Sequence, residues 1–167
     1  EINRDYLFER IQHYWLSNIS PLEPRDCSAT CLFAFRFGDG LIHLGMLGDG
    51  LVAALKPDGS VVSLTEDKGY GFSNITTALS LNVSPNEWRY FSLPEAECIA
   101  VLLCTDGVAD DLDDVDGFVS GFIGAHCSIA EVSANRRTRE MLEKWPTPKH
   151  SDDKTIACLF RENAPDA

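Results

Sequence analysis

Hydrophobic residues recur at helical spacing near the start of the chain. They occupy positions 7, 11, 14 and 15, which predicts one buried face of a helix with Asp5 as its N-cap. Pro21 and Pro24 close that helix off, and Pro146 ends a later one. A short helix is also predicted within the glycine-, serine- and proline-containing stretch 66–86. The predicted helices cover residues 5–18, 74–81, 115–125 and 129–144.

Short apolar runs separated by turn residues predict strands over 30–37, 41–47, 51–56, 60–64, 89–92, 99–104 and 155–160. The first four are joined by tight turns at Gly38-Asp39-Gly40, Gly48-Asp49-Gly50 and Pro57-Asp58-Gly59. Turns this short join antiparallel neighbours, so these four strands are predicted to form one antiparallel sheet. Strand meanders followed by paired helices indicate an α+β layered fold rather than a βαβ array.

Composition and charge narrow the function classes. With 167 residues, 44% of them hydrophobic, the chain is predicted to be a single domain over residues 1–167. A net charge of −12 supplies no basic footprint for nucleic acid. The cluster Arg136, Arg137 and Arg139 is expected to lie on an exposed helix face. No apolar run approaches the roughly 18–20 residues of a membrane span, so neither nucleic acid nor membrane is expected as a partner.

Cysteine usage indicates a reducing compartment. The chain has six cysteines and no CxxC pair. Four of them lie within or beside apolar runs, where a thiol behaves as a small hydrophobic group. We therefore predict reduced thiols and a cytoplasmic location.

Two acidic residues stand where apolar strands end or begin. Asp106 follows the run 99–104 and precedes Gly107, which allows a sharp turn and a close approach of the backbone. Asp152 shortly precedes the strand 155–160. Carboxylates held at rigid strand ends are the hard oxygen ligands that suit Mg²⁺ or Mn²⁺. Each is equally compatible with an ordinary turn or capping residue, and Asp49, taken alone, favours a turn residue.

Taken together, these segments resemble the metal-dependent protein phosphatases of the type 2C family. That family has a strand–Gly-Asp–strand element, a strand ending in (Ser/Thr)-Asp-Gly and a late Asp-Asn-x-(Ser/Thr), in this order. Here they read Gly48-Asp49-Gly50, Thr105-Asp106-Gly107 and Asp152-Asp153-Lys154-Thr155. The segments 26–30, 64–67 and 72–76 are similar to lesser family features, the last to compact bacterial members. The resemblance covers about residues 26–161.

The resemblance implies a fold of two packed antiparallel β-sheets flanked by helices. It also implies Mn²⁺ or Mg²⁺ as cofactor, with Asp106 and Asp152 as ligands of two ions and Asp49 with Asp106 at a third, weaker site. The implied activity is hydrolysis of phosphoserine and phosphothreonine in protein substrates. In that reaction a metal-bridging hydroxide is the nucleophile, so no side chain acts as one. A phosphorylated protein and a cognate Ser/Thr kinase are the implied partners.

The chain departs from the family pattern in its early part. The family hallmark Asp-Gly-x-Gly-Gly, whose aspartate bridges both metals, does not occur in this sequence. Because the chain begins at Glu1 and its first helix resembles one that normally follows the hallmark, we expect residues 1–167 to be the C-terminal two-thirds of such a domain, without its N-terminal strands. Asp153 stands where the family usually has Asn. A catalytically weak or inactive module that binds a phosphoprotein or a kinase is the alternative function.

Two further features carry no chemistry by this interpretation. The acidic stretch 110–116 fails the calcium-loop template and is predicted to be an exposed loop and helix start, where acids favour the helix dipole. None of the four histidines is a ligand candidate, although His150 lies nearest to the acids.

Overall fold

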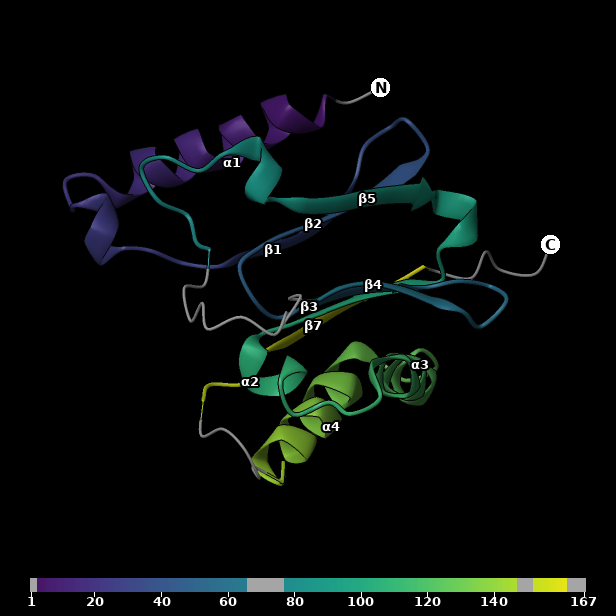
Figure 1. Cartoon of the computed structure of the whole chain (residues 1–167). Helices are drawn as coiled ribbons and strands as arrows, with labels where there is room; N and C mark the ends of the chain where they lie inside the picture. The colour runs from purple at the N-terminus through teal and green to yellow at the C-terminus, as the bar shows by residue number, and fades with distance from the viewer. Residues whose placement is uncertain (1–2, 66–76, 147–151, 162–167) are drawn as a thin grey trace.

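Two antiparallel sheets lie face to face, and helices cover their outer sides (Figure 1). The computed structural model describes residues 3–65, 77–146 and 152–161. One sheet has the order β1-β2-β5 and the other the order β4-β3-β6-β7, which confirms the α+β prediction. The strands are β1 (Cys31–Arg36), β2 (Leu41–Leu47), β3 (Leu51–Leu55), β4 (Val61–Thr65), β5 (Arg89–Pro94), β6 (Ala100–Cys104) and β7 (Ile156–Phe160).

The first four strands do not form one sheet, so that prediction is wrong. β1 pairs with β2, and β3 pairs with β4, but β2 pairs with β5 and not with β3. The turn Gly48-Asp49-Gly50 instead carries the chain from one sheet to the other. Both of its glycines have positive φ (99° and 108°), a conformation that side chains other than glycine rarely adopt.

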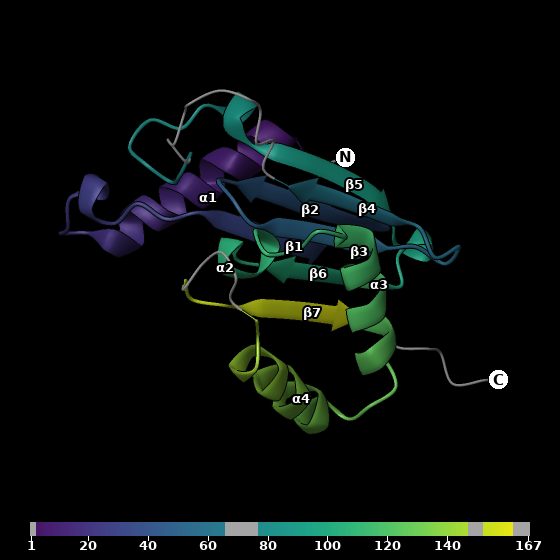
Figure 2. The same ribbon diagram turned by 60° about the horizontal axis from the view of Figure 1, so that its bottom comes forward.

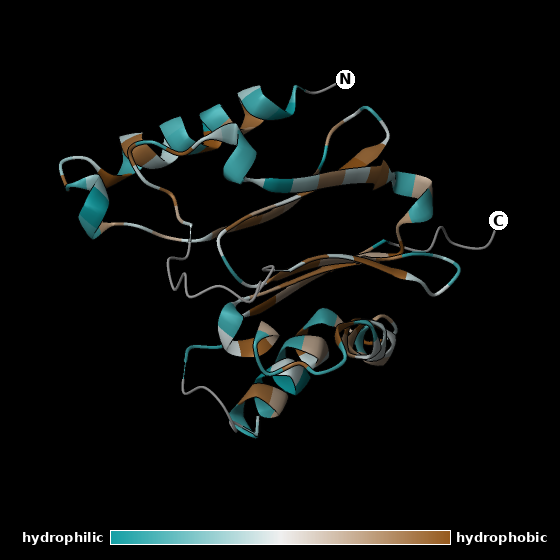
Figure 3. Ribbon diagram, viewed as in Figure 1, coloured by the Kyte–Doolittle hydropathy of each residue, from teal (hydrophilic) through white to brown (hydrophobic). Residues whose placement is uncertain are grey.

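The layer between the sheets is the first part of the core. Its buried residues come from both sheets and include Leu44, Met46, Val52, Ala54 and Val101. Alternate residues of β1, β2 and β5 pack into this layer, for example Leu32 and Ala34 of β1 and Phe91 and Leu93 of β5, because successive side chains of a strand point to opposite faces. The strands are apolar along much of their length. The helices, in contrast, carry most of their polar residues on the side that faces away from the sheets (Figure 3).

Helices α2 (Asp106–Ala109), α3 (Val115–His126) and α4 (Glu131–Glu143) cover the outer face of the four-stranded sheet (Figure 2). Val119, Phe122 and Ile123 of α3 are buried against that sheet, and half-buried side chains at the end of α4 pack against the same cluster. The arginines of α4 at positions 136, 137 and 139 are exposed, as predicted. Three short 3-10 helices, Pro24–Asp26, Pro85–Glu87 and Glu95–Glu97, complete the described elements.

Helix α1 (Arg4–Ile19) covers the three-stranded sheet, where Phe8 stacks on Trp88 with ring centroids 4.9 Å apart. Its N-cap is Asn3, whose side chain accepts hydrogen bonds from two backbone amides, and not the predicted Asp5. The hydrophobic spacing located this helix, but Asn and Asp cap equally well and local sequence did not separate them.

The short helix predicted over 74–81 is wrong for the residues that the structure describes. Residues 77–81 are not helical, and the amide of Leu79 donates to the carbonyl of Ala29 at 2.9 Å in an isolated bridge. Residues 66–76, which include half of the segment 64–67 and all of the segment 72–76, lie outside the described residues, as does His150.

Within the described ranges, no helix has both the length and the apolar character needed to cross a membrane.

Candidate metal centre

The strand register brings the three predicted ligands to one end of the four-stranded sheet. Cys104, the last residue of β6, is paired with the first residue of β3 on one side and the first residue of β7 on the other. Asp49 precedes β3, Asp106 follows β6 and Asp152 precedes β7. In an antiparallel arrangement the entry to one strand lies beside the exit from its neighbour. We call this end of the sheet, with its three aspartates, the acid end.

Thr105 ties the loop after β6 to the loop before β7. Its hydroxyl donates to the carbonyl of Asp153 at 3.2 Å and accepts from the amide of Thr155 at 3.0 Å. Its own amide donates to the carbonyl of Thr155 at 3.1 Å. A Cβ added to Gly107 would lie 2.4 Å from the carbonyl oxygen of Asp153, so only glycine allows the two loops this close.

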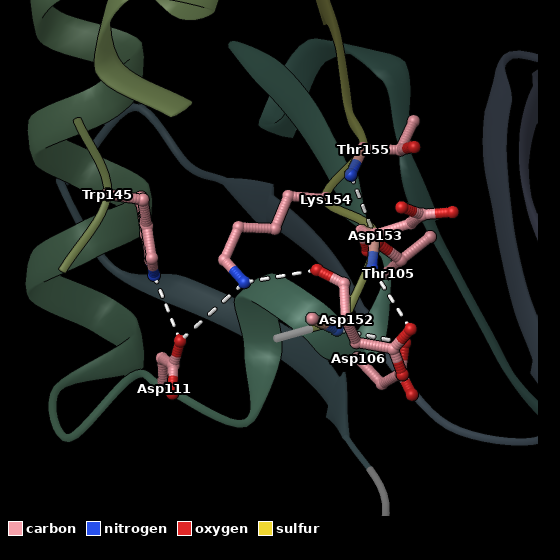
Figure 4. A network of polar contacts seen from close by, with 9 residues as sticks. Thr105, Asp106, Asp111, Trp145, Asp152, Asp153, Lys154 and Thr155 are labelled. Atoms are coloured by element: carbon pink, nitrogen blue, oxygen red, sulfur yellow. Dashed lines mark hydrogen bonds and ion pairs between the residues drawn. The ribbon is translucent and has the colours of Figure 1, made fainter. Parts of the chain in front are cut away.

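The carboxylates differ in their surroundings. Asp106 is half-buried and one of its oxygens accepts from the amide of Gly107 at 2.8 Å. Asp152 is exposed and accepts from the amide of Asp153 at 3.0 Å. Asp49 is half-buried between two buried glycines. In both Asp106 and Asp152, one carboxylate oxygen thus accepts a hydrogen bond from the amide of the following residue (Figure 4).

These residues match the chemistry of a hard divalent cation that keeps several water ligands. Among residues 3–65, 77–146 and 152–161, however, no group of three or more His, Cys, Asp or Glu side chains is arranged to hold a metal ion. The described acids do not by themselves form a metal-binding group of three. The assignment of Asp49, Asp106 and Asp152 as ligands stays a prediction.

Cys104 lies beside this end but belongs to the core. It is 2% exposed, and burial raises the pKa of its thiol to about 12. A thiol with that pKa stays protonated at neutral pH in the metal-free protein. The six cysteines are free, and burial likewise raises the pKa of Cys31 to about 11 and that of Cys158 to about 12.

A buried charged network lies next to the acid end, and the sequence did not reveal it (Figure 4). The side chain of Asp111 is 3% exposed and that of Lys154 is 9% exposed, with Nζ 4.0 Å from Oδ2. The indole Nε1 of Trp145 donates to the same Oδ2 at 3.0 Å. The prediction of an exposed loop over 110–116 is therefore wrong at Asp111, although Asp114 does cap α3. An acid within an acidic run carries no local signal of burial.

Two cavities flank the four-stranded sheet. The smaller, of about 270 Å³, opens at the acid end and is lined by residues that include Gly50, Thr65 and Asp110. The larger, of about 600 Å³, lies at the opposite end, where Arg36 forms an ion pair with Glu95 at 2.7 Å. Of these two cavities, the smaller lies nearer to the predicted ligands, because its lining includes Gly50, which follows Asp49.

A family model described as protein phosphatase 2C matches residues 1–145. The chain belongs to the protein phosphatase 2C family. The match ends before Asp152. The place of the motif 152–155 beside Asp106 is therefore supported by the strand register described above. No curated protein matches the sequence significantly.

Solved phosphatase structures share the fold. A bacterial serine phosphatase is 14% identical with a TM-score of 0.60, over 83% of this chain and 60% of that one. The catalytic domain of the serine/threonine phosphatase PstP, in complex with two manganese ions, is 22% identical with a TM-score of 0.52, over 78% and 57%. PppA, a regulatory component of the T6SS in Pseudomonas aeruginosa, is 17% identical with a TM-score of 0.53, over 93% and 64%.

These identities support likeness of fold alone. The chain spans between about half and two-thirds of the length of the solved phosphatases that it matches. The predicted pair of antiparallel sheets flanked by helices, and the predicted family, are confirmed.

Proposed function

We propose that this chain contributes the acid end of a metal-dependent phosphoserine/phosphothreonine protein phosphatase. The observation that carries the proposal is the β6–β7 register, which joins the exit at Asp106 to the entry at Asp152 in a chain of the protein phosphatase 2C family. The substrate would be a phosphorylated protein, with a cognate Ser/Thr kinase acting on the same sites in a cytoplasmic setting.

Asp106 and Asp152 would hold Mn²⁺ or Mg²⁺, with Asp49 and Asp106 at a weaker third position. Bound divalent ions supply an acidified water and positive charge for the phosphoryl oxygens. The role of the chain is to keep the carboxylates in place: Thr105 joins the two loops and Gly107 allows their close contact. Rigid support of this kind reduces the reorganisation needed when substrate binds.

The decisive experiment measures hydrolysis of p-nitrophenyl phosphate and of a phosphothreonine peptide by the full-length protein, with and without Mn²⁺. We expect hydrolysis that requires Mn²⁺ and is abolished by EDTA. Asp106→Asn should lower the rate by at least about 100-fold, because loss of a ligand removes several kcal/mol of transition-state stabilisation. Asp116→Asn, an exposed acid in the first turn of α3, is the matched control and should be neutral. Hydrolysis that resists EDTA and Asp106→Asn would refute the proposal.

A second candidate is a catalytically weak module that binds a phosphoprotein or a kinase. It is favoured by the finding that, within the part of the chain that the structure describes, no three ligands converge on one metal. This module would bind the phosphothreonine peptide more tightly than its unphosphorylated form, and would not hydrolyse it at any Mn²⁺ concentration. Equal binding of the two peptides would exclude it.

A further inference from the structure

The pair of Asp111 and Lys154 is unusual for its burial. Removing two charges from water costs free energy, and a buried ion pair often contributes no net stability compared with apolar residues. Here the cost is poorly compensated on one side. Oδ1 of Asp111 is buried and has no hydrogen-bond partner among the described residues, while Oδ2 contacts both Lys154 and Trp145. Stability alone therefore gives a weak reason for this arrangement.

The pair connects three segments that are distant in the sequence. Asp111 lies in the loop between α2 and α3, Trp145 follows α4, and Lys154 leads into β7. The ring of Trp145 packs edge-on against Phe118 of α3, with centroids 5.8 Å apart. The carboxylate of Asp111 is thus held by an indole whose own position is set by helix packing.

Lys154 transmits that position to the acid end. Its Nζ donates to the carbonyl oxygen of Asp152 at 3.2 Å. The next carbonyl, that of Asp153, accepts from the hydroxyl of Thr105 at 3.2 Å. Two successive peptide groups are therefore held by side chains from opposite sides of the loop, one anchored on the helices and the other at the end of β6. The carboxylate of Asp152 extends from the first of these peptides.

We propose that Lys154 is a positioning residue, anchored by the buried Asp111 and Trp145, that fixes the backbone of Asp152 and hence the direction of its carboxylate. The expected effect of this role on metal affinity rests on the proposed function. The geometry of the acid end then depends on a residue that contacts no substrate. Through Trp145, Asp111 and Lys154, it also depends on the position of the end of α4. Supporting groups around a ligand commonly change metal affinity by about 10- to 100-fold when removed.

The test uses the whole chain and two readouts, Mn²⁺ affinity by EPR of the free ion and amide exchange by NMR in metal-free protein. Lys154→Met should weaken Mn²⁺ binding by about tenfold and speed exchange at the amides of Asp153 and Thr155. Lys154→Arg, which keeps a charged donor, should recover part of both. Lys144→Met, an exposed lysine at the C-cap of α4, should leave both unchanged.

The double variant Lys154→Met with Asp111→Leu separates positioning from stability. Replacing both charges removes the uncompensated buried charge, so we expect the midpoint of urea unfolding to return toward that of the parent. Mn²⁺ affinity should stay about tenfold low, because the contact to the carbonyl of Asp152 is still missing. Recovery of affinity together with stability would overturn the proposal.

Unchanged amide exchange in Lys154→Met would also overturn it. If the parent chain binds no Mn²⁺, the proposed function fails and the exchange rates alone decide the positioning role. Faster exchange at Asp153 and Thr155 then supports that role, and unchanged exchange contradicts it.

Discussion

The tripeptide Gly-Asp-Gly occurs twice, at 38–40 and at 48–50. The first joins β1 to β2 within one sheet. Its one distant hydrogen bond among the described residues is from the amide of Glu95 to the carbonyl of Gly40, at 2.9 Å. Asp39 accepts from the amide of Leu41 at 3.1 Å and lies 3.1 Å from Nε2 of the buried His43. A Cβ added at Gly38 or Gly40 would meet nothing within 4 Å. The side-chain hydrogen bonds of Asp39 are therefore local, and open space surrounds both glycines.

The second copy joins β2 to β3 across the two sheets, and its surroundings are distant in sequence. A Cβ added to Gly48 would lie 2.7 Å from the carbonyl oxygen of Thr77, and one added to Gly50 would lie 2.7 Å from that of Cys104. Identical local sequence therefore gives a solvent-facing hairpin in one place and a tightly packed crossing, with a predicted ligand, in the other. The difference comes from what packs against the turn.

The largest expected effect comes from Gly50→Ala. The new Cβ meets a backbone oxygen that cannot move aside, and φ is 108°. Backbone strain and overpacking together should lower the free energy of unfolding by about 3 kcal/mol, measured by urea denaturation. Gly38→Ala is the matched control and should change it by less than about 0.5 kcal/mol. A loss below about 1 kcal/mol at Gly50 would show that the crossing is not tightly packed.

Replacing the aspartate of each turn by asparagine compares the metal binding of the two turns. Asp49→Asn should weaken Mn²⁺ binding at the weakest site by about tenfold, because the substitution removes a charged ligand while keeping its shape. Asp39→Asn should leave Mn²⁺ affinity unchanged, since Asp39 lies in a hairpin of the other sheet. Isothermal titration with Mn²⁺ measures both. Equal effects from the two variants would contradict the assignment of Asp49.

Gly40→Ala isolates backbone strain. Gly40 has φ of 78° and open space around its Cα. Only the strain of a left-handed conformation should appear, about 1 kcal/mol in the free energy of unfolding. A loss as large as that at Gly50 would mean that φ alone explains both glycines and that the contact with Cys104 adds nothing.

The smallest effect should come from Asp39→Asn, and it should depend on pH. Burial alone would raise the pKa of Asp39, but hydrogen bonds from Leu41 and His43 outweigh it and lower the pKa. A carboxyl whose pKa is lowered by folding stabilises the protein above its unfolded pKa, and that contribution is lost as pH falls through the folded pKa. The variant should thus be less stable than the parent at pH 7 and equal to it at strongly acidic pH. A difference in urea midpoint that stays constant with pH would contradict this.

Much of the fold could be predicted from apolar periodicity. The predicted strands agree with β1 to β7 within a residue or two at most ends, because alternation and turn residues are local signals. Sheet membership could not be predicted in this way. Gly48-Asp49-Gly50 reads as a hairpin, and its crossing between sheets depends on the pairing of β2 with β5, far along the chain.

The candidate site, like the fold, has one part that could be predicted from the sequence and one part that could not. Asp106 and Asp152 could be found because each follows or precedes an apolar strand, and the order of motifs resembles a family. The support from Lys154 and Asp111 could not be found, because the two residues are 43 positions apart (154 minus 111) and a single distant pair of charges gives no periodic signal. Burial of charge is a property of packing, and it becomes visible only when α4 and the Asp152 loop are placed together.

The β6–β7 register also has an evolutionary consequence. A shift of β7 by two residues along β6 would separate Asp152 from Asp106 by about 7 Å more, because each strand residue advances the chain by more than 3 Å. Insertions or deletions inside either strand are therefore incompatible with the pair. Changes of length in the connection between α3 and α4 leave the register of Cys104 with Ile156 intact. Lineages can thus vary that helical connection in size while inheriting the same distance between the two acids.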